Sequence, residues 1–338
     1  MSASRAERRH SVIVGYGVAG RGLHHRTLCT LFGPEHSVLI VDPRFIGDPM
    51  GGAPWVASIA DCMGALRSAG VDPSEAVFHV TTSPSIHLTC IEELVGSGAR
   101  RIIVEKPMAG TWHDAERIAE LGQGAEILPV SVWLASRVTE VVEEVLGSGA
   151  IGALRSLHME QSKPRFRRTI RSDSHGSAFD IELPHQVLLA LALAGPAERA
   201  VSVHTWPMQL PDRSITSMGG AVVRLLHETG VASTLVTDLT APTRLRRLHL
   251  VGTRGEIVAD YPVSGDDDFG QVRVSGRARR KVVQDAPLSR FVEQAYGYFS
   301  GAGAPPRGDV AMHLKCIALL ESARQTAVPL AIDMEMIS

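Results

Sequence analysis

Three glycines spaced Gly-x-Gly-x-x-Gly directly follow a short apolar run, and few folds can use that arrangement. The run from Ser11 to Val14 predicts a buried strand, and the six residues after it predict a tight turn that opens a helix. In such a turn the first glycine permits the bend, the second lets a pyrophosphate approach the backbone, and the third lets helix and strand pack closely. The helix N-terminus attracts phosphate through its N–H groups and dipole. The sequence therefore predicts a dinucleotide site with five contact residues: Gly15, Tyr16, Gly17, Val18 and Gly20.

A second apolar run favours this interpretation over a plain surface turn, which a chain with 32 glycines could also contain. The run begins at His36 and ends in Asp42, 22 residues after Gly20, close to the roughly 20 residues expected for a carboxylate that binds the ribose 2′-hydroxyl. Asp42 favours NAD because a carboxylate repels a 2′-phosphate, whereas Arg44 would attract one. The predicted cofactor is NAD or NADP, with NAD favoured.

Strands and helices alternate up to about residue 130. The segments 77–82 and 101–104 predict strands, and the segments 87–95 and 111–121 predict helices. This alternation implies a parallel sheet with right-handed crossovers, in which ligands lie at the carboxyl ends of the strands. Four residues fall at those ends: Gly15, Asp42, Ser83 and Lys106.

Lys106 stands out because lysine is rare in this chain. Of the 34 basic residues only four are lysines, namely Lys106, Lys163, Lys281 and Lys315. A primary ammonium is a compact donor whose pKa shifts on burial, whereas a guanidinium stays charged and planar. Lys106 is therefore a candidate for hydrogen-bonding a reacting oxygen. The alternative is a lysine that only forms an ion pair at the end of a strand.

The pattern changes after Gly149. Strands are predicted at 154–160, 199–206, 220–227, 231–237 and 246–251, with an apolar helix at about 184–194 and a last helix at about 309–326. They indicate a large, mostly antiparallel open sheet with one face covered. The charged clusters 266–268 and 277–281 predict solvated hairpins rather than binding sites. We expect a dinucleotide-binding domain over residues 1–130 and an α+β domain over 131–338, with the last helix near their junction.

Composition narrows the range of partners and compartments. The formal net charge of −2 gives no reason to expect nucleic acid or an anionic membrane as a partner. The first ten residues lack the apolar core of a signal peptide, and no stretch reaches the ~18 apolar residues of a membrane-spanning helix. The cysteines are scattered without metal-type spacing, at Cys29, Cys62, Cys90 and Cys316. We therefore expect a cytoplasmic protein without a metal site.

Five motifs together resemble the glucose-fructose oxidoreductase, inositol dehydrogenase and MocA family over nearly the whole chain. They are the glycine turn, the turn 81–84 followed by His87, the strand end Glu105-Lys106-Pro107, the segment 252–256 and the last helix. The resemblance implies a Rossmann domain followed by an α+β domain whose open sheet forms a homodimer or homotetramer. It also implies an NAD(P)-dependent oxidoreductase that acts on sugars, cyclitols or related polyols.

The resemblance assigns roles to single residues. The lysine matching Lys106 lies between nicotinamide and substrate, and the bond into the proline matching Pro107 is often cis. Further cofactor contacts are implied at the ends of the next strands, namely Thr82, Ser83, Pro84, His87 and Glu105.

The family's acid–base pair is altered in this chain. The family has an aspartate four residues before a histidine, whereas Asp180 precedes His185 by five. Residues five apart do not share a helix face, and Pro184 is unsuited to a helix interior. Either a helix begins at Pro184 and leaves Asp180 on the approach to it, or a one-residue bulge keeps the pair together. We favour His185 as the acid–base group, with Asp180 ahead of Glu182 as its orienting partner; the alternative is a histidine satisfied by a capping carboxylate.

The predicted reaction is hydride transfer between the nicotinamide and a secondary alcohol or ketone. His185 would move the hydroxyl proton, and Lys106 would stabilise the developing alkoxide. If the segment lines the cleft, five cations within residues 163–171 suggest an anionic substrate group; the alternative, which we favour slightly, is a solvated loop or a subunit contact. Two other functions stay open: a dinucleotide-binding protein without turnover, and a biosynthetic reductase of C=N bonds or of an unusual ketone.

Overall fold

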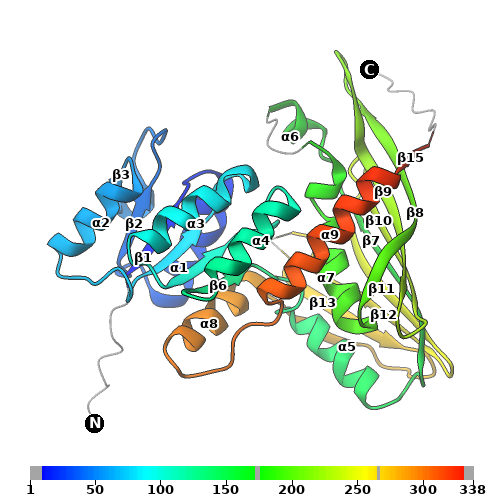
Figure 1. The fold of residues 1–338 in the computed structure, drawn as a ribbon. Coiled ribbons are helices and arrows are strands. Elements are labelled where there is room, and N and C mark those ends of the chain that lie inside the picture. Colours follow the sequence, from blue (N-terminus) through cyan, green and yellow to red (C-terminus); the bar gives the residue numbers. More distant parts are fainter. Residues whose placement is uncertain (1–9, 172–175, 265–266, 331–338) are drawn as a thin grey trace, which may run out of the picture. The chain divides into compact units, whose positions relative to one another are not determined.

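The structure is a computed structural model that describes residues 10–171, 176–264 and 267–330 (Figure 1). The chain forms two compact units. Unit 1 comprises Met1–Ser131 and Leu288–Leu314, and unit 2 comprises Val132–Pro287 and Lys315–Ser338. Each unit is described on its own.

Unit 1 is built on sheet A, a parallel sheet of six strands in the order β3-β2-β1-β4-β5-β6. Residues of β1 and β4 are buried along their whole length, so both faces of the sheet are covered. The strand order reverses between β1 and β4, which makes the carboxyl ends of these two strands the switch point where such sheets bind ligands. The strands are β1 (Ser11–Val14), β2 (Val38–Val41), β3 (Trp55–Val56), β4 (Val77–Val80), β5 (Arg101–Val104) and β6 (Glu126–Pro129).

Helices connect these strands. The helix that follows β1 opens with a π-helical segment, Gly20–His25, and continues as α1 (Arg26–Phe32). Ser58 and Thr111 cap α2 (Ile59–Ser68) and α4 (Trp112–Leu121) by accepting hydrogen bonds from Asp61 N and Asp114 N, 3.1 Å each. The other two helices are α3 (His87–Gly96) and α8 (Pro287–Phe299).

Unit 2 is built on sheet B, in the order β14-β13-β12-β11-β7-β10-β9-β8-β15. Its pairs are antiparallel except for β7 with β10 and β8 with β15. The predicted fold class is thus confirmed: a parallel Rossmann-type sheet and a large, mostly antiparallel sheet. The strands are β7 (Leu154–Ser162), β8 (Ala197–Gln209), β9 (Ser214–His227), β10 (Ala232–Asp238), β11 (Leu245–Gly252), β12 (Glu256–Asp260), β13 (Phe269–Val274), β14 (Lys281–Gln284) and β15 (Val328–Pro329).

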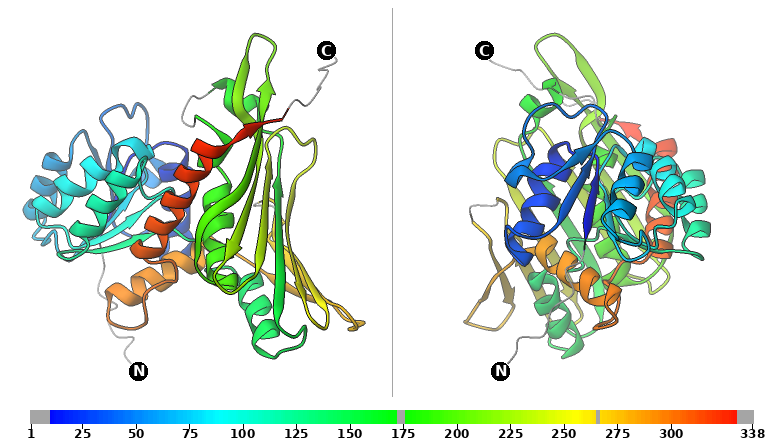
Figure 2. Two further views of the ribbon diagram at one scale, coloured as in Figure 1. Left: turned by 45° about the vertical axis from the view of Figure 1, so that its right-hand side comes forward. Right: turned by 90° about the vertical axis from the view of Figure 1, so that its left-hand side faces the viewer.

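Helices cover one face of sheet B. Figure 2 shows α5 (Arg137–Gly147) and α7 (Leu183–Ala194) on the same side of the sheet. Ten of the twelve residues of α7 are buried, because its apolar surface meets β7 and β10. The opposite face carries no helix from the described part of unit 2. Along β10, partly exposed side chains such as Thr234 and Val236 alternate with buried ones, as expected for a sheet covered on one face. Two further helices are α6 (Phe166–Arg171) and α9 (Val310–Thr326). The boundary between the two units falls within α9, after Leu314.

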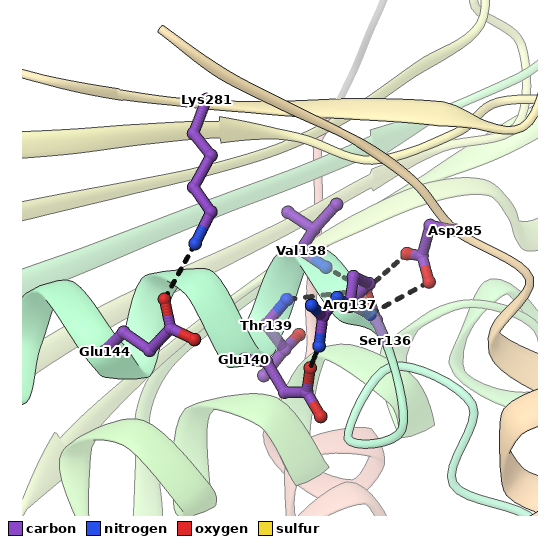
Figure 3. Close-up of polar contacts among 8 residues, drawn as sticks. All are labelled: Ser136, Arg137, Val138, Thr139, Glu140, Glu144, Lys281 and Asp285. Carbon is purple, nitrogen blue, oxygen red and sulfur yellow. Dashed lines mark hydrogen bonds and ion pairs between the residues drawn. The ribbon is translucent and has the colours of Figure 1, made fainter.

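The N-terminus of α5 is fixed to the segment after β14, far along the chain. Asp285 accepts hydrogen bonds from Ser136 Oγ (2.5 Å) and Arg137 N (2.9 Å), as Figure 3 shows. Ser136 Oγ in turn accepts from Val138 N (3.1 Å) and Thr139 N, which satisfies two free donors of the first turn. A buried carboxylate at a helix N-terminus is also favoured by the helix dipole.

Most predicted elements of both sheets are present, and the charged segment 277–281 lies at an exposed turn between β13 and β14, as expected. The cluster 266–268 extends outside the described residues. Elements without a prediction are mainly α2, α5, α6 and α8 and the short strands β3, β6 and β12.

Candidate functional site

The glycine turn after β1 has the geometry that a phosphate-binding turn needs. Gly15 has φ +90°, and a Cβ on it would lie 2.7 Å from Thr82 Cγ2. A Cβ on Gly20 would lie 2.1 Å from the carbonyl oxygen of Gly15, so neither position accepts a side chain. A Cβ on Gly17 would meet nothing within 4 Å, which leaves the backbone open to a ligand at that position. Arg21 N donates to Gly17 O (2.9 Å), so the helix begins directly after the open glycine.

The carboxylate of Asp42 lies at the end of β2 and faces the turn. Its Oδ2 accepts from Tyr16 N (2.8 Å), and its Oδ1 accepts from Arg44 N (2.9 Å). Each oxygen keeps a lone pair, so the carboxylate can still accept from a sugar hydroxyl. The side chain of Arg44 is exposed, and that of Tyr16 is buried with its hydroxyl 2.6 Å from His25 Nδ1.

The turn after β4 places Thr82, Ser83 and Pro84 beside the glycine turn, since Thr82 is the residue that a Cβ on Gly15 would strike. His87 lies beneath this turn and is fully buried. Its Nε2 is 3.1 Å from Thr82 O and its Nδ1 is 3.2 Å from Met108 O. Burial lowers the pKa of His87, and hydrogen bonds to the two carbonyls partly offset this. His87 therefore links the turn after β4 to the turn after β5.

Lys106 lies at the end of β5, and the Lys106–Pro107 peptide bond is cis, as the resemblance implies. The preceding residue, Glu105, is nearly buried, with 12% of its side chain exposed. Its carboxylate is 3.0 Å from His24 Nε2 and accepts from Lys106 N at 3.0 Å. Burial alone would raise the pKa of Glu105, but the hydrogen bond from His24 and the charges of His24 and Lys106 outweigh it and lower the pKa. Glu105 is therefore ionised beside Lys106.

These observations fit a dinucleotide. The open backbone at Gly17, the side chain of Val18 with 69% exposure and the available lone pairs of Asp42 lie around the carboxyl ends of β1 and β2. The hydroxyl of Thr82 is also buried at this turn. Within the described ranges, no group of three or more His, Cys, Asp or Glu side chains could hold a metal ion.

In unit 2, His185 is held on an aromatic stack. Its ring lies 5.9 Å from the ring of Trp133 at an angle of 9°. Trp133 is stacked in turn on Tyr261, with centroids 4.8 Å apart. The buried Tyr261 hydroxyl is 2.9 Å from Thr139 Oγ1, which ties the stack to α5. This arrangement fixes the plane of the imidazole.

Of the two resolutions foreseen for the altered spacing, the structure shows a helix that begins around Pro184. A short 3₁₀ turn, Ala178–Asp180, precedes it. Asp180 pairs with Arg324 of α9, and it also accepts from Ser177 N at 3.2 Å. Glu182, with 5% of its side chain exposed, pairs with Lys163. Each acid next to His185 thus has a cationic partner of its own.

A cluster of buried polar groups, which sequence reasoning missed, lies near the carboxyl ends of β7 and β10. Their atoms lack hydrogen-bond partners in the described chain: both amide atoms of Gln161, Nε of Arg165, Oγ1 of Thr169 and Thr237, and Oε1 of Gln186. Gln161 and Thr237 are paired neighbours in the two strands. Gln186 Nε2 donates to Val236 O (2.8 Å), and Arg165 N donates to Leu239 O (2.9 Å). Buried polar atoms are normally satisfied, so water or a ligand is expected here.

Arg165 is the most unusual member of this cluster. It is 5% exposed, and burial, together with the charge of Arg168, lowers its pKa to about 10. A buried guanidinium is costly unless an anionic group binds it. The sequence signal was the cationic segment 163–171, which did not distinguish this arginine from its exposed neighbours Arg167 and Arg168.

No protein-family model and no curated protein matches the chain. Solved structures do. A 3-ketoreductase from Actinomadura kijaniata, in complex with TDP-benzene and NADP, has a TM-score of 0.74 and 17% identity, covering 96% of this chain and 99% of that one. UDP-N-acetylglucosamine 3-dehydrogenase from Acidithiobacillus ferrooxidans has a TM-score of 0.70 and 16% identity, covering 94% and 97%. An oxidoreductase from Agrobacterium radiobacter, in complex with NAD+, L-tartaric acid and magnesium, has a TM-score of 0.74 and 16% identity, covering 95% and 96%. At these identities the likeness establishes the fold, and the expected similarity in fold to NAD(P)-dependent oxidoreductases is confirmed.

Proposed function

We propose that this protein is an NAD(P)-dependent oxidoreductase that transfers a hydride between the nicotinamide and a secondary alcohol or ketone of a sugar, cyclitol or related polyol. The observation that carries the proposal is the turn around Gly17, with its open backbone, at the same edge of sheet A as Asp42 and Lys106. The solved structures with the same fold are a ketoreductase, a dehydrogenase and an oxidoreductase, two of them with a bound nicotinamide dinucleotide. Asp42 favours NAD over NADP.

Two residues would act on the reacting oxygen. Lys106 would donate a hydrogen bond and stabilise negative charge as it develops. His185, whose ring plane is fixed by Trp133, would accept or give the hydroxyl proton. The nicotinamide, when bound, supplies or takes the hydride. The two side chains belong to different units, so their joint action is tested by substitution of each.

Asp180 is proposed ahead of Glu182 as the residue that orients His185. The carboxylate of Glu182 is more deeply buried and is engaged by Lys163, whereas Asp180, with 24% of its side chain exposed, pairs with Arg324. Asp180→Asn should then lower turnover more than Glu182→Gln at equal stability. The reverse order would assign the role to Glu182.

We further propose that the substrate carries a phosphate or another anionic group. The buried Arg165 has an Nε without a hydrogen-bond partner in the described chain, and neighbouring hydroxyl and amide groups lack one as well, so together they offer the donors that such an anion needs. The ketoreductase with this fold was solved with TDP-benzene, and the dehydrogenase acts on a UDP-linked sugar. Nucleotide-linked and phosphorylated sugars are therefore the first candidates.

The test is the absorbance of NADH and NADPH with purified protein and a panel of polyols, cyclitols, sugar phosphates and nucleotide-linked sugars, run in both directions. Lys106→Ala should abolish turnover, and so should His185→Ala. Lys281→Ala is the matched control, because Lys281 pairs with Glu144 on the surface of unit 2. Tight NADH binding without turnover on any substrate would favour a dinucleotide-binding protein. Turnover confined to imines would favour a reductase of C=N bonds.

We also propose that copies of the chain associate through the face of sheet B that carries no helix from the described part of unit 2. Half-exposed residues such as Val222 and Val236 lie opposite each other on neighbouring strands of that face. Sedimentation should show a dimer or tetramer, and Val236→Arg should shift it toward the monomer. A monomer at all concentrations would contradict this.

None of the helices in the described part of the chain has the length and apolar character needed to span a membrane.

A further inference from the structure

A continuous chain of hydrogen bonds runs through the interior of unit 1 and ends beside Lys106. It starts at His36, which is half-buried, and continues through groups that are nearly or fully buried. The links are His36 Nε2 to Ser11 Oγ (2.7 Å), Ser11 Oγ to Tyr296 OH (2.5 Å), Tyr296 OH to His79 Nε2 (2.9 Å), His79 Nδ1 to His24 Nδ1 (2.7 Å), and His24 Nε2 to Glu105 Oε1 (3.0 Å).

The position of each proton follows from the chemistry of the ends. Glu105 is ionised and only accepts, so His24 donates to it through Nε2. In the form with a neutral His24, its Nδ1 carries a lone pair, and the proton between the two Nδ1 atoms belongs to His79. Burial holds the pKa of His79 well below its ordinary value, and the charges of His24 and His36 act in the same direction, so His79 is neutral.

The second half of the chain follows in the same way. With its proton on Nδ1, the neutral His79 accepts at Nε2, so Tyr296 donates to it. Ser11 then donates to Tyr296, and His36 donates to Ser11 through Nε2. In this protonation form, all five donors point from His36 toward Glu105. This is the order in which protons can hop one bond at a time along a hydrogen-bonded chain.

We propose that this chain is a proton relay between His36 and Glu105 that exchanges the proton of Lys106 with solvent during turnover. Its use in catalysis rests on the proposed function. A proton binds His36 at Nδ1; at each link one N–H or O–H bond breaks and one forms, and Glu105 gains a proton. Glu105, whose pKa is lowered in part by the charge of the adjacent Lys106, passes the proton to Lys106 after the ammonium has protonated the reacting oxygen. Hydride plus proton converts a ketone to an alcohol, so the electrons and atoms balance, and the reverse sequence serves oxidation.

The relay gives the reaction a proton route besides His185. The ionisable groups whose charges act on its two ends are His10 and His25 at His36, and Lys106 and His87 at Glu105. Burial, followed by the charges of His10 and His25, lowers the pKa of His36, so this ring is mostly neutral near pH 7 and holds an added proton only briefly.

The first test needs no substrate. Protein labelled with 15N at histidine shows the ring N–H protons of His24 and His79 by NMR, and their exchange with solvent can be timed. The relay predicts exchange faster than global unfolding allows, and it predicts that Tyr296→Phe slows that exchange by about tenfold or more, because the middle link is lost. Tyr298→Phe, on the same helix but outside the chain, should leave exchange unchanged.

Equal exchange in Tyr296→Phe and the unmodified protein would overturn the relay, because the protons would then leave by local opening. Thermal unfolding checks that the variant is folded. If it is not, Ser11→Ala breaks the neighbouring link and tests the same point. A ring proton on His24 Nδ1 instead of Nε2 would also overturn the proposed order.

The second test separates the relay from the proposed function. On the panel substrate with the highest turnover, Tyr296→Phe should lower kcat by about tenfold and change the solvent isotope effect, with NADH affinity unchanged. Normal kcat and isotope effect despite slowed exchange would overturn the catalytic use of the relay. Loss of turnover in Lys106→Ala concerns the proposed function alone and should leave the exchange of the His24 proton intact.

Discussion

The imidazole of His185 lies almost parallel to the indole of Trp133, at 9° and 5.9 Å between ring centroids. The two residues come from different segments of unit 2, α7 and the stretch before α5. His185 lies in the first turn of α7, a helix that is mostly apolar, and the indole of Trp133 fixes the plane of its ring.

Substituting Trp133 should therefore impair catalysis without affecting cofactor binding. Trp133→Leu removes the flat surface and should lower kcat by about tenfold to a hundredfold, since small misplacements of catalytic groups carry costs of that size. Trp133→Phe keeps an aromatic ring and should lose much less. Steady-state kinetics with the best panel substrate measures this, with Trp112→Leu as control. Equal losses in the Leu and Phe variants would contradict the stacking argument.

Arg165 should lower the thermal stability of the protein and strengthen its binding of an anionic ligand. Arg165→Met removes a buried charge whose Nε has no hydrogen-bond partner in the described chain, so we expect a higher melting temperature. The same variant should lose about tenfold or more in affinity for UDP, the probe for an anionic ligand, because a charge-assisted pair is lost. Calorimetric titration with UDP and thermal unfolding measure the two effects.

The matched control is Arg167→Met, because Arg167 lies only two residues further along the chain, in α6, but is exposed. Arg167→Met should change neither the melting temperature nor the affinity for UDP by much. A less stable Arg165→Met protein with unchanged UDP binding would show that the guanidinium is structural.

Elements that depend on local pattern could be predicted from the sequence. The glycine turn, Asp42 at the end of β2 and the strand end at Lys106 follow from spacing, because their geometry is set within about 30 residues by one strand–turn–helix unit. The apolar periodicity of α5, with Val138, Val141 and Val142 buried, was also readable, although no prediction was made there.

Long-range contacts could not be predicted in this way. Tyr296 meets Ser11 across 285 positions, and Asp285 caps α5 across 148 or more; no periodicity encodes such a pairing. The five-residue spacing of Asp180 and His185 left two backbone paths open, and the 3₁₀ turn before α7 resolves them through local packing. Which cation of residues 163–171 is buried depends on β10, to whose end Arg165 is hydrogen-bonded.

Asp42 should set the preference for NADH. Asp42→Ser removes an acceptor for the ribose hydroxyls and a charge that repels a 2′-phosphate, so NADH should bind about tenfold more weakly and NADPH more tightly. Fluorescence titration of both cofactors measures the ratio. Asp42→Asn is the control for backbone geometry, because its amide oxygen can still accept from Tyr16 N or Arg44 N. An unchanged ratio in Asp42→Ser would place specificity elsewhere, with Arg44 as the first alternative.

The buried His313 should make the protein less stable as the pH is lowered into the acid range. Its ring is buried 2.8 Å from Ser131 Oγ, and burial lowers its pKa from 6.5 to about 3. Below pH 6.5 the unfolded chain binds a proton that the folded chain refuses until about pH 3, so stability is full above 6.5 and is lost as the pH falls through this window. One such group changes the free energy of unfolding by about 1.4 kcal/mol per pH unit.

Urea unfolding of His313→Gln at about pH 7, 6 and 5 measures this effect. The free energy of unfolding of the variant should change less steeply with pH than that of the unmodified protein, by about that amount per pH unit. The pKa of His79 is shifted in the same direction and this residue remains in the variant, so some dependence on pH should persist after His313 is replaced.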